Sequence, residues 1–344
     1  MLTEKDYKEI KKELDECQKP LFFFDDDPDG LSSFLLLYRY KNEGKGIIVK
    51  THPKLDTTLL PKVEEYNPDK IFIVDVPLVE QEFVDGCKRP VIHVDHHTPL
   101  DLHGVKYFNP RVKGGDKHQP ASYLCYKTVN QDLWLAAVGT VGDWFFMPLL
   151  KEFKKEYPKL LPDEIKTAPD ALYTTPLGKL IRIFSFILKG NTHDAMKYIK
   201  VLTRIQDPRE VLEQTTAQGK FLYKRYEKIN KKYESLLNDA VEKASKEAVL
   251  VYTYDTDKMS FSSDLSNELI YRYPDKIIVV GRSKSGYMKG SIRSSKRIIS
   301  GILEKALVGV DGYGGGHELA CGYCVHEDDF DRFIENLKRE LSEE

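Results

Sequence analysis

Three short apolar segments in the N-terminal part of the chain each end in an acidic residue. They are residues 21–24 before Asp25, residues 71–74 before Asp75 and residues 91–94 before Asp95. Short apolar runs bounded by turns are typical of buried β-strands. Helical patterns lie between them, and this alternation predicts an α/β fold with a doubly wound parallel sheet. The carboxyl edge of such a sheet would gather the three acidic ends.

The first acidic end holds four carboxylates within five positions, at Asp25, Asp26, Asp27 and Asp29. Like charges this close raise one another's pKa unless a positive charge lies between them, and a divalent metal ion is the simplest such charge. A solvated acidic turn is the alternative interpretation. We favour the metal because so apolar a strand should feed a packed sheet edge. A helix-length apolar run, residues 34–40, follows two serines.

Histidines and a fourth acidic end extend this pattern. His96 and His97 follow Asp95, and Asp143 closes the apolar segment 133–141. Taken alone, Asp143 would be a helix cap. Beside three acidic strand ends, a fourth metal ligand is the better interpretation. Carboxylates with one or two imidazoles form a hard oxygen and nitrogen site that suits Mn²⁺ or Mg²⁺.

The length of 344 residues favours two domains over one. We expect an N-terminal catalytic domain over residues 1–215, a long connecting helix over 216–247 and a smaller C-terminal α/β domain over 248–344. The helix carries the basic residues Lys224, Arg225, Lys228, Lys231 and Lys232. These residues either line a nucleic-acid groove or form a solvated face, and the interleaved acids favour the solvated face.

Two motifs of the C-terminal domain are suited to phosphate binding. Arg293 at a strand end can hold a phosphate with two hydrogen bonds. Gly314, Gly315 and Gly316 would let backbone amides approach a phosphate, and His317 adds a donor. As a lone motif, the glycine run would more often be a flexible turn.

The five cysteines are scattered and odd in number, which indicates reduced thiols inside a cell. Cys321 and Cys324 form a C-x-x-C, but the alternating neighbours favour a strand over a zinc site. The chain has no apolar run of about 18 residues and no signal-peptide core, so we expect a cytoplasmic protein without a membrane contact. With a net charge of −2, any nucleic acid must be held by local basic groups.

In this order the acidic ends resemble the four motifs of the DHH-superfamily phosphoesterases. The matching residues are Asp25-x-Asp27-x-Asp29-Gly30, Asp75, Asp95-His96-His97 and Asp143. Arg293 and the run from Gly314 to His317 resemble the DHHA1-type substrate-binding domain associated with them. The resemblance covers nearly the whole chain. Length and domain order are most similar to the RecJ-like nucleases, with the archaeal-type Hef-associated nuclease as one candidate among them.

The resemblance implies two Mn²⁺ ions, with Mg²⁺ as a substitute. One ion would bind Asp27 and Asp75, and the other would bind Asp29, Asp75, His96 and Asp143. Asp75 would bridge the ions, and His97 would face the scissile phosphate as a second catalytic residue. Some relatives have a histidine where this chain has Phe23, and Asp25 is the candidate replacement ligand.

The function that the resemblance implies is a Mn²⁺-dependent exonuclease on single-stranded DNA or RNA. We expect 3′–5′ polarity, a role in DNA repair or replication-fork processing, and a helicase or repair protein as partner. The alternative is a phosphodiesterase or phosphatase for oligoribonucleotides, phosphoadenosine phosphate or cyclic dinucleotides. A non-enzymatic scaffold is a third hypothesis, and the intact acidic set argues against it.

Overall fold

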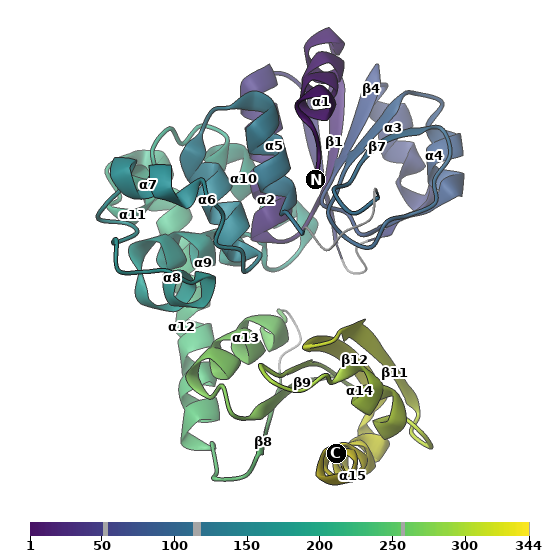
Figure 1. The fold of residues 1–344 in the computed structure, drawn as a ribbon, viewed down its shortest axis with the longest axis vertical. Coiled ribbons are helices and arrows are strands. Elements are labelled where there is room, and N and C mark those ends of the chain that lie inside the picture. Colours follow the sequence, from purple (N-terminus) through teal and green to yellow (C-terminus); the bar gives the residue numbers. More distant parts are fainter. Residues whose placement is uncertain (51–53, 113–117, 256–258, 344) are drawn as a thin grey trace. The chain divides into compact units, whose positions relative to one another are not determined.

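The computed structural model describes residues 1–50, 54–112, 118–255 and 259–343, and Figure 1 shows the fold. The chain divides into two compact units, Met1–Tyr226 and the part from Glu227 onward. The boundary lies inside one helix, α12 (Ala217–Glu242). Each unit combines a five-stranded sheet with helices, and the sheet of the first is wholly parallel, which confirms the predicted fold class.

The sheet of the first unit has the strand order β2-β1-β4-β6-β7. Its strands are β1 (Pro20–Asp25), β2 (Lys45–Val49), β4 (Lys70–Val74), β6 (Val91–Val94) and β7 (Val105–Phe108). A separate two-stranded sheet joins β3 (Lys54–Leu55) to β5 (Leu78–Val79). The three predicted strands are confirmed. The fifth strand, β7, was not predicted, because only four residues form it and their pattern is weak.

Helices cover both faces of this sheet, which explains why its strands are apolar throughout. Phe24 stacks on Phe34 of α2 at a centroid distance of 4.5 Å. Phe23 points to the other face and meets Phe83 of α4 edge-on at 5.4 Å. Figure 1 shows α1 (Glu4–Glu16), α2 (Pro28–Lys41) and α5 (Ala121–Val129) on one side, and α3 (Leu60–Tyr66) and α4 (Gln81–Cys87) on the other.

The strand order reverses between β1 and β4. The chain leaves β1 for β2 on one side and then returns to β4 on the other. Such a switch point opens a crevice at the carboxyl ends of the two strands, where ligands of open α/β sheets bind. Asp25 ends β1 and Asp75 follows β4, so both lie at this crevice.

Helix α2 begins at Pro28 and so includes part of the acidic turn, ahead of the apolar run 34–40. Asp27 caps the helix by accepting a hydrogen bond from the Gly30 amide at 2.8 Å, and proline suits the first turn. Gly30 permits a close approach to β1, because a Cβ there would lie 2.7 Å from the carbonyl oxygen of Asp25. The first turn therefore places Asp29 directly beside the strand end.

A layer of helices completes the first unit and leads into α12. Its members are α6 (Leu133–Gly142), α7 (Leu150–Glu156), α8 (Ala168–Thr174), α9 (Pro176–Leu188), α10 (Thr192–Leu202) and α11 (Pro208–Leu212). Among the described residues, no single helix is long and apolar enough to cross a membrane. Helices α8 and α9 reach that length together, but the chain bends by 82° between them.

The second unit has a mixed sheet of order β11-β12-β10-β9-β8, in which β8 and β9 are parallel and the other pairs antiparallel. Its strands are β8 (Val249–Asp255), β9 (Ile277–Lys284), β10 (Tyr287–Arg293), β11 (Gly312–His317) and β12 (Ala320–His326). Its helices are α13 (Ser262–Arg272), α14 (Ser300–Ala306) and α15 (Phe330–Glu343). Side chains of α14 and α15, such as Ile302 and Phe333, pack on Val279 and Ile292 of the sheet to form its core.

The glycine run corrects one prediction. Gly314, Gly315 and Gly316 do not form a turn, because they belong to the edge strand β11 and pair with β12. A Cβ at Gly314 would lie 2.9 Å from the carbonyl oxygen of Gly322, so the strand needs glycine to lie this close to its neighbour. The prediction of a strand at the C-x-x-C is confirmed, since Cys321 and Cys324 are buried free thiols of β12.

Candidate metal centre

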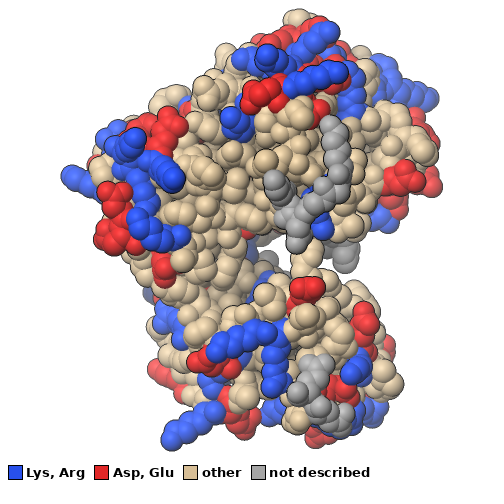
Figure 2. Space-filling view, in the orientation of Figure 1, with Lys and Arg blue, Asp and Glu red and all other residues tan. Residues whose placement is uncertain are grey.

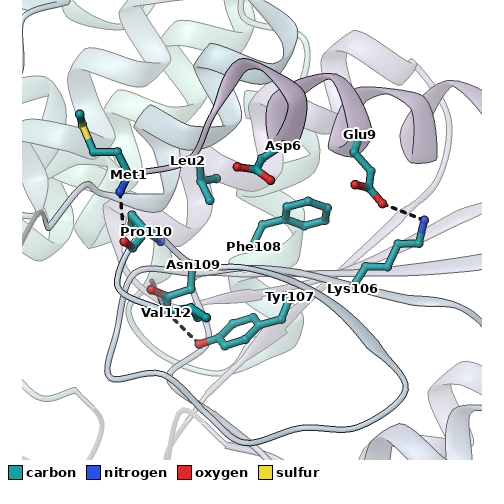
Figure 3. A pocket seen from close by; sticks show the side chains of 10 residues that line it. All are labelled: Met1, Leu2, Asp6, Glu9, Lys106, Tyr107, Phe108, Asn109, Pro110 and Val112. Carbon is teal, nitrogen blue, oxygen red and sulfur yellow. Dashed lines mark hydrogen bonds and ion pairs between the residues drawn. The ribbon is translucent and has the colours of Figure 1, made fainter. Parts of the chain in front are cut away.

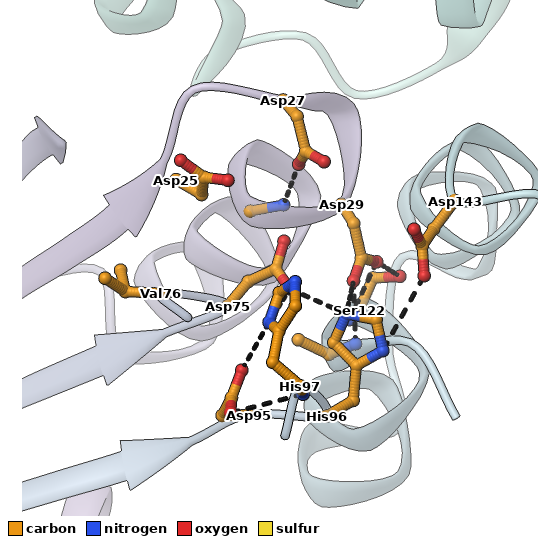
Figure 4. Close-up of polar contacts among 12 residues, drawn as sticks. Asp25, Asp27, Asp29, Asp75, Val76, Asp95, His96, His97, Ser122 and Asp143 are labelled. Atoms are coloured by element: carbon orange, nitrogen blue, oxygen red, sulfur yellow. Dashed lines mark hydrogen bonds and ion pairs between the residues drawn. The ribbon is translucent and has the colours of Figure 1, made fainter. Parts of the chain in front are cut away.

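The carboxyl edge of the first sheet gathers the acidic residues that the sequence singles out (Figure 4). Strand ends, the first turn of α2 and the C-terminal end of α6 supply them. Figure 4 draws Asp25, Asp27, Asp29, Asp75, Asp95, His96, His97 and Asp143 around one small volume. Residues more than a hundred positions apart in the chain thus meet at the switch point of the sheet.

Asp75 lies at the centre of this cluster. Its backbone φ is +61°, and its side chain is 1% exposed. Oδ1 lies 3.1 Å from Nε2 of His96, yet it has no hydrogen-bond partner among the described residues. Burial raises the pKa of Asp75 well above its usual value, and the charges of Asp29, Asp27, Asp25 and Asp143 raise it further. A buried carboxylate in this state is suited to a cation.

Asp29 is fully buried and held by the start of α5. Its carboxylate accepts hydrogen bonds from the amides of Ala121 at 2.7 Å and Ser122 at 3.1 Å, and from the Ser122 hydroxyl. Burial and the charge of Asp27 raise the pKa of Asp29 to about 7, although these hydrogen bonds oppose the shift. The first turn of α5 therefore fixes the orientation of Asp29 toward the cluster.

His96 connects Asp75 to Asp143. Its Nδ1 lies 3.7 Å from Oδ2 of Asp143, and neither atom has a hydrogen-bond partner among the described residues. Burial lowers the pKa of His96 to about 3, and the charge of His97 contributes. The ring is therefore neutral, which is the form that binds metals. Asp143 is the C-cap residue of α6, and burial and the charge of Asp29 raise its pKa well above the usual value. Asp143 is therefore a helix cap residue and also lies in contact with His96.

His97 is held by Asp95 rather than by the other carboxylates. Its Nδ1 lies 2.8 Å from Oδ1 of Asp95, which is fully buried. Asp95 also accepts hydrogen bonds from Tyr107 at 3.2 Å and Asn109 at 3.1 Å. Burial opposes the charged form of His97, but the bond to Asp95 raises the pKa of the imidazole above its usual value. Asp95 therefore fixes the orientation of the His97 ring through Nδ1.

Asp25 and Asp27 form the outer part of the cluster. Burial raises the pKa of Asp25 well above its usual value, followed by the charges of Asp27 and Asp26. Asp27 uses Oδ1 to cap α2. Phe23, where some relatives have histidine, is fully buried and packs on Phe83, so it supplies no ligand atom.

These observations fit a divalent metal site. Buried carboxylates repel one another, and among the described residues Oδ1 of Asp75 and Oδ2 of Asp143 have no hydrogen-bond partner, so a cation would relieve both conditions. The adjacent imidazole of His96 is neutral and can act as a further ligand. One ligand atom each from Asp75, His96 and His97 lies within 4.8 Å of the others. A second group of this kind comprises His96, His118 and Asp143.

Several residues of the site were not predicted as such. His118 lies beside His96 and stacks on Phe145 at 5.0 Å. Asn109 and Tyr107 support Asp95, and Ser122 supports Asp29. The sequence feature that could have indicated His118 is its position two residues before Pro120, the N-cap residue of α5. A single histidine in a polar segment is weak evidence for a metal ligand.

A separate pocket lies between α1 and the end of β7 (Figure 3). It holds about 250 Å³. Tyr107 and Asn109 line it while their polar groups reach Asp95. The other lining residues are Met1, Leu2, Asp6, Glu9, Lys106, Phe108, Pro110 and Val112. None of the carboxylates of the cluster lines this pocket. The pocket therefore lies behind Tyr107 and Asn109, the residues that hold Asp95, and is separate from the candidate metal centre.

The predicted phosphate-binding residues lie in the second unit. Arg293 donates to Oδ1 of Asn267 at 2.7 Å, to Oγ of Ser263 at 3.1 Å and to the carbonyl oxygen of Cys321 at 3.3 Å. His317 ends the edge strand β11 and is exposed. A Cβ at Gly315 would meet no atom within 4 Å, so this stretch of the strand is open. The structure brings these residues together at one end of the second sheet.

Comparison with known proteins gives the family of the second unit. Residues 218–343 match the DHHA1 domain family. A sequence comparison with curated proteins finds no match.

Solved structures with a similar fold extend over the whole chain. RecJ from Thermus thermophilus with Mn²⁺ has a TM-score of 0.72 and 19% identity, and the match covers 100% of this chain and 55% of that one. An exonuclease RecJ bound to manganese has a TM-score of 0.59 and 18% identity, with 99% and 95% covered. A pGpG-specific phosphodiesterase from a Vibrio species has a TM-score of 0.51 and 14% identity, with 94% and 99% covered. The chain thus spans about half the length of the Thermus RecJ, 55%.

The chain is an α/β protein whose first unit carries an acidic, histidine-containing switch point at the edge of a parallel sheet. Its C-terminal part matches the DHHA1 domain family, and the whole chain has the fold of the RecJ structures, which agrees with the resemblance seen in the sequence.

Proposed function

We propose that the chain is a metal-dependent phosphodiesterase that degrades single-stranded DNA or RNA as an exonuclease. The observation that carries this proposal is the cluster of buried carboxylates around Asp75, in which Oδ1 of Asp75 and Oδ2 of Asp143 lack a hydrogen-bond partner among the described residues and lie beside His96. The fold of two RecJ structures, both solved with manganese, supports it.

The ligand assignment is part of the proposal. Asp27 and Asp75 would hold one Mn²⁺ or Mg²⁺ ion, with Asp25 as an added ligand. Asp29, Asp75, His96 and Asp143 would hold a second ion. Two divalent ions would supply Lewis-acid stabilisation of the phosphate charge and an activated water.

The chain's own residues contribute further steps. Asp95 holds Nδ1 of His97, which leaves Nε2 for the substrate, and the raised pKa of the ring favours the imidazolium form, in which Nε2 also carries a proton. We assign to Nε2 a hydrogen bond to a phosphate oxygen or proton donation to the leaving oxygen. In the second unit, Arg293, His317 and those amides of Gly314, Gly315 and Gly316 that face the open edge of β11 would hold a neighbouring phosphate.

The net charge of the chain does not provide long-range electrostatic attraction for a nucleic-acid substrate. The chain has a net charge of −2, and Figure 2 shows basic and acidic side chains interspersed over the visible face of each unit. Recognition must therefore come from local groups. Polarity of 3′–5′, a role in DNA repair or fork processing and a helicase or repair partner stay predictions from the sequence.

The alternative function is hydrolysis of short substrates such as oligoribonucleotides, phosphoadenosine phosphate or cyclic dinucleotides. The fold shared with a pGpG-specific phosphodiesterase supports this alternative. A digest with Mn²⁺ of single strands labelled at either end, run beside a dinucleotide, separates the two functions. Stepwise shortening of the long strand supports the exonuclease, and cleavage of the dinucleotide alone supports the alternative. Hydrolysis of neither substrate would refute phosphodiesterase activity.

A further inference from the structure

A basic and aromatic surface of the first unit continues from the acidic turn after β1. Lys50 follows β2 at the carboxyl edge of the sheet, and its Nζ lies 4.0 Å from Oδ2 of Asp26. The same ammonium group donates to the carbonyl oxygens of Leu188 and, at 3.1 Å, of Gly190 at the C-terminal end of α9. Lys50 therefore links this end of α9 to the acidic turn.

Arg225 of α12 extends the surface from that point. Its Nη2 donates to the carbonyl oxygen of Lys189 at 2.6 Å. Its guanidinium lies over the ring of Tyr198 in α10, 5.1 Å from the ring centroid. Tyr198 in turn stacks on Phe221 of α12, with ring centroids 5.0 Å apart and an interplanar angle of 22°. Phe221 and Arg225 are four residues apart, so they lie on the same face of the helix.

The outer end of this series is an exposed aromatic ring. Phe221 is 46% exposed although its ring is already stacked on one side. Lys224, three residues along α12, is exposed on the same face. An exposed ring beside cations is the arrangement that binds single-stranded nucleic acid, since a base stacks on the ring and phosphates meet the cations.

Lys50 and Arg225 donate to the carbonyl oxygens of consecutive residues, 188–190, so the two cations lie near each other. Burial lowers the pKa of Lys50, Asp26 opposes the shift, and the charges of Lys189 and Arg225 lower the pKa further. These three cations therefore lie close together, and an anion would relieve their repulsion. Asp194 at the start of α10 is an acid that interacts with Arg225.

We propose that Phe221, Tyr198, Arg225 and Lys50 form a track that binds the substrate strand beyond the nucleotide being hydrolysed. A base stacks on Phe221, and phosphates lie near Arg225 and Lys50. The track rests on the proposed function and narrows its substrate class to strands of several nucleotides. In the competing interpretation, the basic face of α12 is solvated and Phe221 only packs on Tyr198.

Binding in the presence of a chelator tests the track without hydrolysis. The probe is a fluorescein-labelled single strand of about twelve nucleotides, followed by fluorescence anisotropy. We expect Phe221→Ala to weaken binding about tenfold, because stacking of one base contributes this much or more. Phe221→Tyr keeps the ring and should bind as the wild type does. Phe221→Leu keeps an apolar contact with Tyr198 but lacks the aromatic face, so it should bind as weakly as the alanine variant.

Wild-type affinity in the leucine variant would overturn the track, as would unchanged binding in the alanine variant. The second measurement is the ratio of kcat/KM for the long strand to that for a dinucleotide with Mn²⁺, which should fall about tenfold in Phe221→Ala. If the wild type degrades long strands and this ratio is unchanged, the track fails and the proposed function stands. If the wild type degrades neither substrate, the proposed function fails, and the binding assay still decides on the track.

Discussion

Replacement of Asp75 by asparagine should abolish hydrolysis without destabilising the fold. Asparagine removes the charge and keeps the shape, and it tolerates the left-handed backbone at this position, where φ is +61°. Alanine would add roughly 1–2 kcal/mol of backbone strain there, so Asp75→Ala confuses a structural effect with the loss of a ligand. The asparagine variant therefore isolates the role of the carboxylate.

The expected magnitudes follow from its central position. Loss of a ligand shared by two ions should reduce activity at least about a hundredfold, which is about 2.7 kcal/mol in barrier. In the wild type, Mn²⁺ at about a hundred times its Kd should add about 2.7 kcal/mol of stability, or about 5–10 °C in Tm for a unit of this size. Most of this gain should disappear in Asp75→Asn.

For the metal-free protein, removal of the Asp75 charge should have the opposite effect on stability. The folded state raises the pKa of Asp75, so ionisation of this carboxyl group destabilises the fold from about pH 4 upward, and the effect is complete above the raised pKa. In a chelator at neutral pH, Asp75→Asn should therefore melt at or above the wild-type temperature. The difference should vanish as the pH falls toward about 4, the value of an unperturbed aspartate.

Two measurements check this reasoning: Mn²⁺-dependent hydrolysis of a single strand, and thermal unfolding with Mn²⁺ and with chelator. More than about a tenth of wild-type activity in Asp75→Asn would refute the bridging role. A lower Tm in chelator would refute the view that the metal-free cluster is strained by its charges. Asp26→Asn is a matched control, because Asp26 is exposed and is not assigned to either ion.

Three further predictions concern other parts of the chain. A chelator should stop hydrolysis, and Mn²⁺ should restore it better than Mg²⁺; full activity of a metal-free preparation contradicts this. His317→Ala should lower kcat/KM about tenfold or more and leave Tm unchanged. Arg293→Ala should lower kcat/KM and also Tm, because Arg293 donates a hydrogen bond to Asn267. Normal kinetics in both variants would exclude phosphate binding by Arg293 and His317. Burial opposes the charged form of Asp69, but hydrogen bonds from Cys17 and two backbone amides lower the pKa of its carboxyl group to about 2. Asp69→Asn should therefore reduce Tm at neutral pH, and the difference in Tm from the wild type should disappear as the pH falls from about 4 to about 2. A difference in Tm that persists at about pH 2 would contradict this.

The strand ends of the site could be predicted from the sequence because their pattern is local. An apolar run that ends in aspartate places that side chain at the carboxyl edge of a parallel sheet, whichever helices follow. Asp25, Asp75 and His96 lie together for this reason. The start of α2 was placed too late, because Asp27 acts both as a member of an acidic run and as the cap of the helix.

The supporting residues depend on contacts that no local pattern contains. Asn109 and Tyr107 reach Asp95 only because β7 pairs with β6, and a four-residue strand leaves little trace in the sequence. The glycine run has the opposite problem. Its composition favours a turn, but close packing against Gly322 overrides that preference and makes it an edge strand.

The start of α5 shows why the ligands and their supports must be considered together. Asp29 is held by the Ala121 and Ser122 amides at the positive end of a helix dipole, which partly offsets the cost of burying its charge. The remaining cost is visible in its raised pKa, to about 7. The helix therefore stabilises Asp29 enough to fix its position but leaves charge for a cation to neutralise. A carboxylate that was fully paired in the metal-free fold would gain less from a metal ion.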